Sequence, residues 1–272
     1  MKVKLLAFDL DGTIIMEDRK TITRQSLEAI KYAADKRVKI VVATGRMISA
    51  IPQEILGMDC IDYIITANGA CLQNAKTKEV MHKCGLNYKK VDELCRLAEK
   101  LGIFYELYCD GKSYAPRYNK DIINKFNIHE EFFDLLNDRT IAYESLKELK
   151  NDGIGVEKFN MLSIPYDKYK EVWVAFSKVK GINQVSSIKI NIEINSEETS
   201  KWNAIKVLCD KINIDINDVM TIGDSGNDYE MIKNSGIGVC MGNGFDEVKH
   251  VSKYVTKSIC EEGFSYALKK FI

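Results

Sequence analysis

The stretch AFDLDGTII, residues 7–15, carries two aspartates directly after a strongly apolar segment. Residues 3–10 are mostly apolar and do not alternate regularly with polar ones, which is typical of a parallel strand covered on both faces. Asp9 and Asp11 therefore stand at the edge of what we expect to be the most buried strand. Because carboxylates at such a place repel each other unless they are compensated, the stretch predicts a site as well as a sheet.

Strands and helices are expected to alternate on both sides of the middle of the chain. In chain order we expect strand 3–10, helix 23–36, strand 38–45, helix 47–56, strand 62–66, and later helix 200–212 and strand 219–223. Thr23 is the expected N-cap of the first helix. This alternation predicts an α/β fold, in which a parallel sheet carries helices on both sides.

The middle of the chain has a different pattern. Asp110-Gly111 is a hairpin signal between two short strands. The other expected elements are helix 88–101, helix 119–137, strand 158–164, helix 166–179 and strands within 182–194. Paired strands with separate helices predict an inserted α+β domain, residues 85–187. The core would then comprise residues 1–84 and 188–272, with hinges near 82–87 and 186–190.

Composition narrows the class of protein. The 272 residues are 46% hydrophobic, which suffices for a large core, and the 39 basic residues match the 39 acidic ones. Balanced charge argues against nucleic-acid binding, which needs a basic surface. No apolar run reaches the roughly 20 residues of a membrane span, and we expect no signal peptide. The eight cysteines form no CxxC pair, so we expect reduced thiols in a cytoplasmic protein.

Four polar segments follow expected strands or open expected helices. They are DLDGT (9–13), TGR (44–46), Lys201 and GDSGND (223–228). In an open α/β sheet, ligands bind beyond the carboxyl ends of the strands. Each segment alone is a weak signal, since it could equally be a turn or a solvated surface. Together, in this order, they predict one crevice built from segments that are far apart in the sequence.

The acids of these segments predict a divalent cation. Asp9, Asp11, Asp224 and Asp228 would gather negative charge in a small volume, and repulsion there reaches several kcal/mol unless it is compensated. Hard oxygen ligands favour Mg²⁺ over softer metals. Lys201 adds one positive charge. Cation, ammonium and neutral donors together suit a phosphate group.

A reaction follows from the same residues. We expect Asp9 to attack phosphorus and form an aspartyl-phosphate, while Asp11, two positions on, acts as general acid and then general base. Asp224 would be a second carboxylate on the metal, and Asp228 would orient Lys201 or a metal-bound water. The groups expected to bind phosphate are the Thr44 hydroxyl, the backbone at Gly45, the Lys201 ammonium and the Asn227 amide. The Asn227 amide could instead order the ligands of the metal.

These segments resemble the four motifs of the haloacid dehalogenase-like (HAD) superfamily, and within it the Cof-type phosphatases with a large α+β cap. DLDGT, ATGR, TSKWNAI and GDSGNDYEM match in order, and ANGA (67–70) and residues 238–256 resemble further segments of that branch. The resemblance implies a Rossmann-like core, a C2-type cap and Mg²⁺-dependent hydrolysis of small phosphorylated metabolites. The metal ligands it implies are the carboxylates of Asp9 and Asp224 and the backbone carbonyl of Asp11.

Two positions depart from the pattern of that branch. Trp202 follows the lysine where a glycine is common, and its helical position predicts packing in the core. Glu262-Gly263 replaces a common Asp-Gly. Two rival functions stay open: a phosphomutase, and a catalytically silent HAD-like binding module. The substrate also stays open among sugar phosphates, pyridoxal phosphate, flavin mononucleotide and others.

Overall fold

The computed structural model describes residues 2–121, 123–149 and 155–272. Contacts within the chain divide it into two compact units, each described by itself below. The core unit comprises Met1–Arg46, Ala50–His82 and Ser200–Ile272, and the inserted unit comprises Met47–Ser49 and Lys83–Thr199. The class is α/β with an inserted α+β part, as the sequence predicted.

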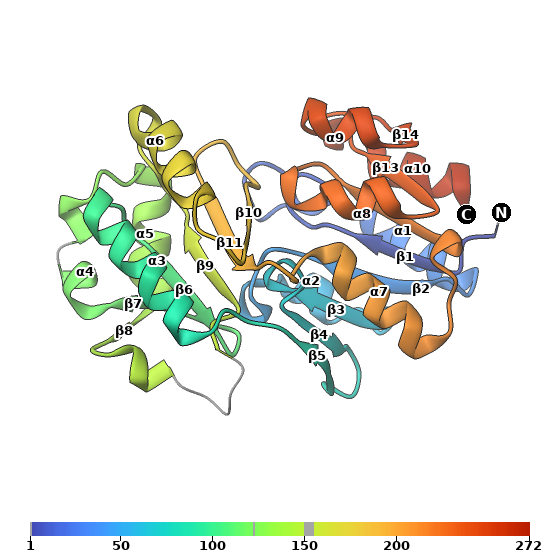
Figure 1. Ribbon diagram of the computed structural model, residues 1–272. Coiled ribbons are helices and arrows are strands. Elements are labelled where there is room, and N and C mark those ends of the chain that lie inside the picture. The colour runs from blue at the N-terminus through green and yellow to red at the C-terminus, as the bar shows by residue number, and fades with distance from the viewer. Residues whose placement is uncertain (1, 122, 150–154) are drawn as a thin grey trace. The chain divides into compact units, whose positions relative to one another are not determined.

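The core sheet has the strand order β14-β13-β12-β1-β2-β3-β4-β5 (Figure 1). Pairing is parallel from β14 through to β3 and antiparallel between β3 and β4. The strands are β1 (Leu5–Phe8), β2 (Lys39–Ala43), β3 (Tyr63–Thr66), β4 (Cys71–Asn74), β5 (Val80–Lys83), β12 (Val219–Gly223), β13 (Ile237–Cys240) and β14 (Tyr254–Val255). The central position of β1, between β12 and β2, explains its continuous apolar sequence.

Helices cover both faces of the core sheet. They are α1 (Arg24–Asp35), α2 (Gln53–Leu56), α7 (Lys201–Ile212), α8 (Tyr229–Asn234), α9 (Asp246–Val251) and α10 (Gly263–Phe271). The short 3₁₀ helices of the core unit are η2 (Ala67–Gly69), η5 (Ile216–Asp218), η6 (Gly226–Asp228) and η7 (Ile259–Glu261), while η1 (Ile48–Ala50) has residues in both units. On one face Leu5 and Ala7 pack in a cluster with α7, α8 and α9. On the other, Phe8 meets Phe264 of α10 edge to face at 5.1 Å.

Two helix starts in the core unit are capped by side chains, and the first of these caps, Thr23, was predicted. The Thr23 side chain accepts a hydrogen bond from Ser26 N at 3.2 Å and caps α1. Ser200 caps α7 in the same way through Asn203 N. Trp202 is 7% exposed and packs in the hydrophobic cluster beneath α7, which confirms its predicted packing role.

The inserted unit is built on a second sheet, in the order β10-β11-β9-β6-β7-β8. Its strands are β6 (Glu106–Cys109), β7 (Lys112–Pro116), β8 (Thr140–Tyr143), β9 (Lys158–Met161), β10 (Ile182–Val185) and β11 (Ile192–Ser196). Its helices are α3 (Tyr88–Leu101), α4 (Arg117–Asp121), η3 (Ile123–Lys125), α5 (Glu130–Arg139), η4 (Leu146–Leu149) and α6 (Tyr166–Ser177). Asp110 and Gly111, both with positive φ, turn β6 into β7 as the sequence predicted.

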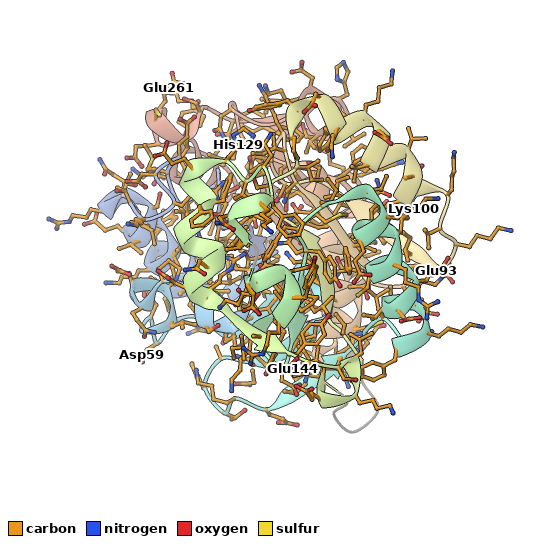
Figure 2. All side chains as sticks on the ribbon, turned by 90° about the vertical axis from the view of Figure 1, so that its left-hand side faces the viewer. Asp59, Glu93, Lys100, His129, Glu144 and Glu261 are labelled. Atoms are coloured by element: carbon orange, nitrogen blue, oxygen red, sulfur yellow. The ribbon has the colours of Figure 1, made fainter. Side chains whose placement is uncertain are left out.

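One face of this second sheet is apolar and the other is polar. Leu107, Phe159 and Ile194 point to the apolar face, where they pack with α3 and α6. The opposite outer sides of these helices are polar, and Figure 2 shows the exposed Glu93 and Lys100 at the periphery of α3. Alternation along each strand with period two accounts for the separation of the faces.

The polar face of the inserted sheet carries three buried charged residues, Glu106, Lys158 and Glu193, beside the neutral polar side chains of Tyr108 and Asn160. Glu106 accepts hydrogen bonds from Arg139 and, at 2.6 Å, from Asn160. Lys158 lies 3.3 Å from Glu193 and 4.6 Å from the centre of the Tyr108 ring. Among the described residues, the side-chain oxygen of Asn160 is one of three buried side-chain polar atoms without a hydrogen-bond partner.

Two predicted helices are wrong in their extent. The helix expected over 47–56 is split into η1 and α2, because Pro52 disfavours helical conformation in the residue before it. The helix expected over 119–137 is replaced by α4, η3 and α5. Its first half is rich in Asn and Asp, whose side chains compete for backbone hydrogen bonds and favour turns. Strands β4, β5 and β8 were not predicted.

We predict that Ile205→Ala destabilises the core unit. Ile205 is fully buried in the cluster between α7 and the sheet, so truncation leaves a cavity and should cost about 2–5 kcal/mol of unfolding free energy. Urea denaturation followed by far-ultraviolet circular dichroism measures the change. Lys206→Ala, at the next and exposed position of the same helix, is the control. Equal denaturation midpoints for the two variants would contradict the packing assignment.

Candidate active site

Asp9 lies in the loop that leaves β1. Its backbone N–H donates to Ile222 O of β12 at 2.9 Å, which continues the pairing of the two strands beyond Phe8. The side chain follows the buried strand into the interior, and Asp9 is 4% exposed. The apolar sequence before Asp9 therefore fixes this carboxylate in place.

Two glycines allow backbone and carboxylate to approach closely. Gly12 has a φ of +73°, and a Cβ there would lie 2.4 Å from Asp224 Oδ2. Gly223 ends β12, where a Cβ would lie 2.4 Å from Asp228 Cγ. A side chain at either position would collide with a site carboxylate. Both motif glycines are therefore required because a carboxylate lies close to their backbone. At Gly12 the left-handed backbone conformation is a second reason.

Lys201 joins the ends of two core strands to α7. Its ammonium lies 2.6 Å from Asp9 Oδ1 and 2.7 Å from Asp228 Oδ1, and the side chain is fully buried. The N-cap Ser200 and the first helical position at Lys201 bring the side chain to this point. Two carboxylates satisfy a cation that could not be buried alone.

Asp228 has both oxygens engaged by the protein. Oδ1 accepts from Lys201, while Oδ2 accepts from the backbone N–H groups of Asp224 and Ser225 at 3.0 and 3.1 Å. This carboxylate also completes a capping box at η6. Its bonds suit the predicted role of orienting Lys201 better than that of a metal ligand.

Three carboxylates form a group that could hold a metal ion. Asp9, Asp224 and Asp228 each bring an oxygen within 4.8 Å of the others. When all are ionised, three negative charges face the single ammonium of Lys201. The two uncompensated charges and the hard oxygen donors match a divalent cation such as Mg²⁺. Asp9 and Asp224 are the better ligands, because Asp228 is already fully bonded.

The pKa values of this group show the same charge imbalance. Burial raises the pKa of Asp9 to about 8, although Lys201 beside it acts in the opposite direction. Burial, with the charge of Asp228, also raises the pKa of Asp224 well above its ordinary value. Burial alone would lower the pKa of Lys201, but the charges of Asp228 and Asp9 outweigh it and raise that pKa. By itself, the protein therefore does not fully neutralise its own carboxylates.

Asp11 lies apart from the three-carboxylate group. Both of its oxygens accept from the guanidinium of Arg46, at 2.6 and 2.8 Å. The side chain of Asp11 is 42% exposed. Asp11 thus follows Asp9 in the same loop, but its carboxylate is held at a more open place.

Thr44 and Asn227 also reach the carboxyl ends of the core strands. Thr44 is fully buried, and its hydroxyl accepts from Arg46 N at 3.1 Å. Asn227 donates from Nδ2 to Asn68 Oδ1 at 3.0 Å and accepts at Oδ1 from the Ser225 hydroxyl. Asn227 therefore has bonds within the protein on both sides of its amide. Gly45 lies between Thr44 and Arg46 in the same loop.

Asn68 and Arg46 were not among the predicted site residues. Asn68 has a φ of +60° in η2 and carries the oxygen that Asn227 binds. The next residue, Gly69, lies so close to Ser200, the N-cap of α7, that a Cβ at Gly69 would be 2.2 Å from Ser200 O. The segments ANGA and TGR were the available signals, but their partners are distant in sequence.

None of the helices in the described ranges has the length and apolarity that a membrane span needs.

A family model described as haloacid dehalogenase-like hydrolase matches residues 6–268. YxeH of Bacillus subtilis (strain 168) is 30% identical over 273 residues, which cover 99% of this chain and 98% of that protein. YcsE of the same organism, named a 5-amino-6-(5-phospho-D-ribitylamino)uracil phosphatase, is 27% identical over 272 residues, 99% of this chain and 96% of that protein.

A solved structure of similar fold is the HAD subclass IIB sugar phosphatase BT4131. Its TM-score is 0.78 at 26% identity, over 99% of both chains. Fold, ordered motifs and sequence similarity agree over nearly the whole length. This chain belongs to the haloacid dehalogenase-like hydrolases and is a phosphatase of their Cof-type branch.

Proposed function

We propose that this phosphatase hydrolyses small phosphomonoesters with the help of Mg²⁺ and through an aspartyl-phosphate on Asp9. The observation that carries the proposal is the buried Asp9 carboxylate, fixed by Lys201 beside Asp224 and Asp228. A fixed and desolvated carboxylate is a competent nucleophile toward phosphorus.

The chemistry of the donor set supports a divalent cation held by Asp9, Asp224 and the backbone carbonyl of Asp11. When bound, Mg²⁺ supplies charge neutralisation for the transferring phosphoryl group. The residues of the protein do the remaining work. Lys201 binds Asp9 and, in addition, one oxygen of the phosphate. The other phosphate oxygens accept hydrogen bonds from Thr44, the backbone at Gly45 and Asn227.

In the first step, an oxygen of Asp9 attacks phosphorus and the bond from phosphorus to the alcohol oxygen breaks. Lys201 binds Oδ1 of Asp9, which leaves Oδ2 as the attacking atom. Asp11 gives its proton to the departing alcohol oxygen. The products of this step are the free alcohol, the acyl phosphate on Asp9 and an ionised Asp11.

In the second step, water attacks the same phosphorus. Asp11 takes a proton from that water, and the bond between phosphorus and the Asp9 oxygen breaks. Inorganic phosphate leaves, Asp9 is again a carboxylate, and Asp11 is again protonated. Asp228 acts throughout by holding Lys201 in place.

We propose that the inserted unit, Met47–Ser49 and Lys83–Thr199, selects the alcohol of the substrate. Its sheet carries the buried polar face of Glu106, Lys158 and Glu193, while the core groups address only phosphate. The names of two relatives indicate different substrates. YcsE is named a 5-amino-6-(5-phospho-D-ribitylamino)uracil phosphatase, and BT4131 is named a sugar phosphatase. The alcohol therefore depends on features other than the shared motifs.

We also propose a cytoplasmic location. All eight cysteines are free thiols, the form that a reducing compartment maintains.

We predict that a panel of metabolite phosphates with Mg²⁺ will release inorganic phosphate. The best substrates should reach a kcat/KM of about 10⁴ M⁻¹s⁻¹ or more. The panel should include sugar phosphates, pyridoxal phosphate and flavin mononucleotide. Both the released inorganic phosphate and the identity of the organic product are measured. An isomer of the substrate that forms without release of inorganic phosphate would indicate a mutase. No turnover of any member would favour the binding module.

We predict that Asp9→Asn abolishes turnover while the fold survives. An amide cannot form the acyl phosphate, so kcat should fall at least about 10³-fold. Hydrolysis of p-nitrophenyl phosphate measures turnover, and the far-ultraviolet circular dichroism spectrum shows whether the fold survives. Asp35→Asn, at the exposed end of α1, should keep full activity. Unchanged turnover by Asp9→Asn would refute the mechanism.

We predict that Mg²⁺ stabilises the protein through Asp224. Binding to the folded state alone, at a concentration 100 times Kd, adds about 2.7 kcal/mol, seen as a rise in melting temperature that EDTA reverses. Asp224→Asn should lose most of this rise. Asp246→Asn, whose carboxylate is exposed at the start of α9, should retain it. Equal rises in both variants would place the ion elsewhere.

A further inference from the structure

The guanidinium of Arg46 binds three separate places in the core unit. Nε and Nη2 donate to the two oxygens of Asp11 at 2.8 and 2.6 Å. Nη1 donates to Ala50 O at 2.8 Å, and Nη2 also donates to Arg19 O at 3.3 Å. The loop after β1, the segment around Arg19 and the loop after β2 are thus joined through one side chain.

Such an arrangement fixes Arg46 before any ligand binds. Its side chain is 19% exposed, and the two backbone carbonyls orient the planar group independently of Asp11. A guanidinium that binds both oxygens of a carboxylate sets the plane of that carboxylate as well as its position. A lysine, which presents a single point charge on a flexible stem, cannot impose that plane.

The position that Arg46 imposes differs from that of the other site acids. Asp11 is absent from the three-carboxylate group among the described residues, although only Leu10 separates it from Asp9. Arg46 holds the Asp11 carboxylate where it is 42% exposed. Of its four lone-pair directions, the guanidinium uses one on each oxygen. The Arg46 guanidinium leaves the remaining lone-pair directions of both oxygens unused.

We propose that Arg46 is a positioning residue that holds the Asp11 carboxylate for both proton transfers of the reaction. This inference rests on the proposed function, in which Asp11 first protonates the leaving alcohol and then deprotonates water. Arg46 itself exchanges no proton and touches no reacting atom. It acts through Asp11, by keeping that carboxylate out of the metal group and in one orientation.

The test separates the two chemical steps with Arg46→Met. A p-nitrophenolate ion leaves as a stabilised anion without needing a proton, so its release in the first turnover should change little, within about threefold. Its steady-state turnover should fall about 10²-fold, because general-base help in the second step is lost. An initial burst of p-nitrophenolate should therefore appear. With the best aliphatic phosphomonoester, whose alcohol needs the proton, the first turnover itself should slow about 10²-fold.

A double-mutant cycle tests whether Arg46 acts through Asp11. In an Asp11→Asn background, Arg46→Met should cause little further loss, because the two residues act as one unit. Arg46→Lys should recover only part of the activity that Arg46→Met loses, since lysine restores the positive charge without the planar guanidinium. Arg24→Met removes an arginine from an exposed pair with Glu28 on α1 and should leave every rate unchanged.

Each other outcome overturns the inference. Equal losses in the first turnover for both leaving groups would show a merely structural role. A higher KM with unchanged kcat would assign Arg46 to substrate binding. Full additivity in the cycle would separate it from Asp11. Circular dichroism and melting temperature confirm folding, and Arg46→Lys carries the test if Arg46→Met does not fold. Turnover by Asp9→Asn would instead refute the proposed function, whatever Arg46 does.

Discussion

The buried ammonium of Lys201 is the interaction on which the site depends. It lies between Asp9 and Asp228, so one charge connects the ends of β1 and β12 with the start of α7. A buried ion pair is weak evidence of stability, because desolvation offsets much of its attraction, but removal of one partner leaves an unpaired buried charge. Loss of Lys201 would therefore disturb both carboxylates at once. Gly69 lies so close to Ser200 O, at the start of the helix that carries Lys201, that a side chain at position 69 would have no room.

Lys201 leaves the charge of the site incomplete, and that deficit is itself informative. Asp9, Asp224 and Asp228 lie within 4.8 Å of one another, and burial raises the pKa of Asp9 to about 8 despite the adjacent ammonium. A fold selected for stability alone would not gather these acids in its interior. The cation and the phosphoryl group of the proposed function would compensate this charge. Asp11 lies outside this group, and the Arg46 guanidinium binds both of its carboxylate oxygens.

The sequence allowed much of the core to be predicted, because the decisive signals there are local. Each of these signals can be recognised in a short window of sequence. They are the continuous apolar strands, the Thr23 cap and the acids of the motifs. Errors arose where local signals were weak or contradictory. Pro52 interrupts an otherwise helical segment, and β4, β5 and β8 lack the continuous buried run that marks β1. Their pairing comes from neighbours in the sheet, which no single window of sequence contains.

The sequence by itself indicated the family and the fold class, because the motifs that contain Asp9, Thr44, Lys201 and Asp224 occur in the order typical of that family. Only the tertiary structure decided which of these groups bind one another. It paired Asp11 with Arg46 rather than with the other acids, and it bonded both sides of the Asn227 amide within the protein. The reason is physical: a hydrogen bond depends on distance and direction. Residues as far apart in sequence as Lys201 and Asp9, which are separated by 192 positions, acquire both only when the sheet has formed.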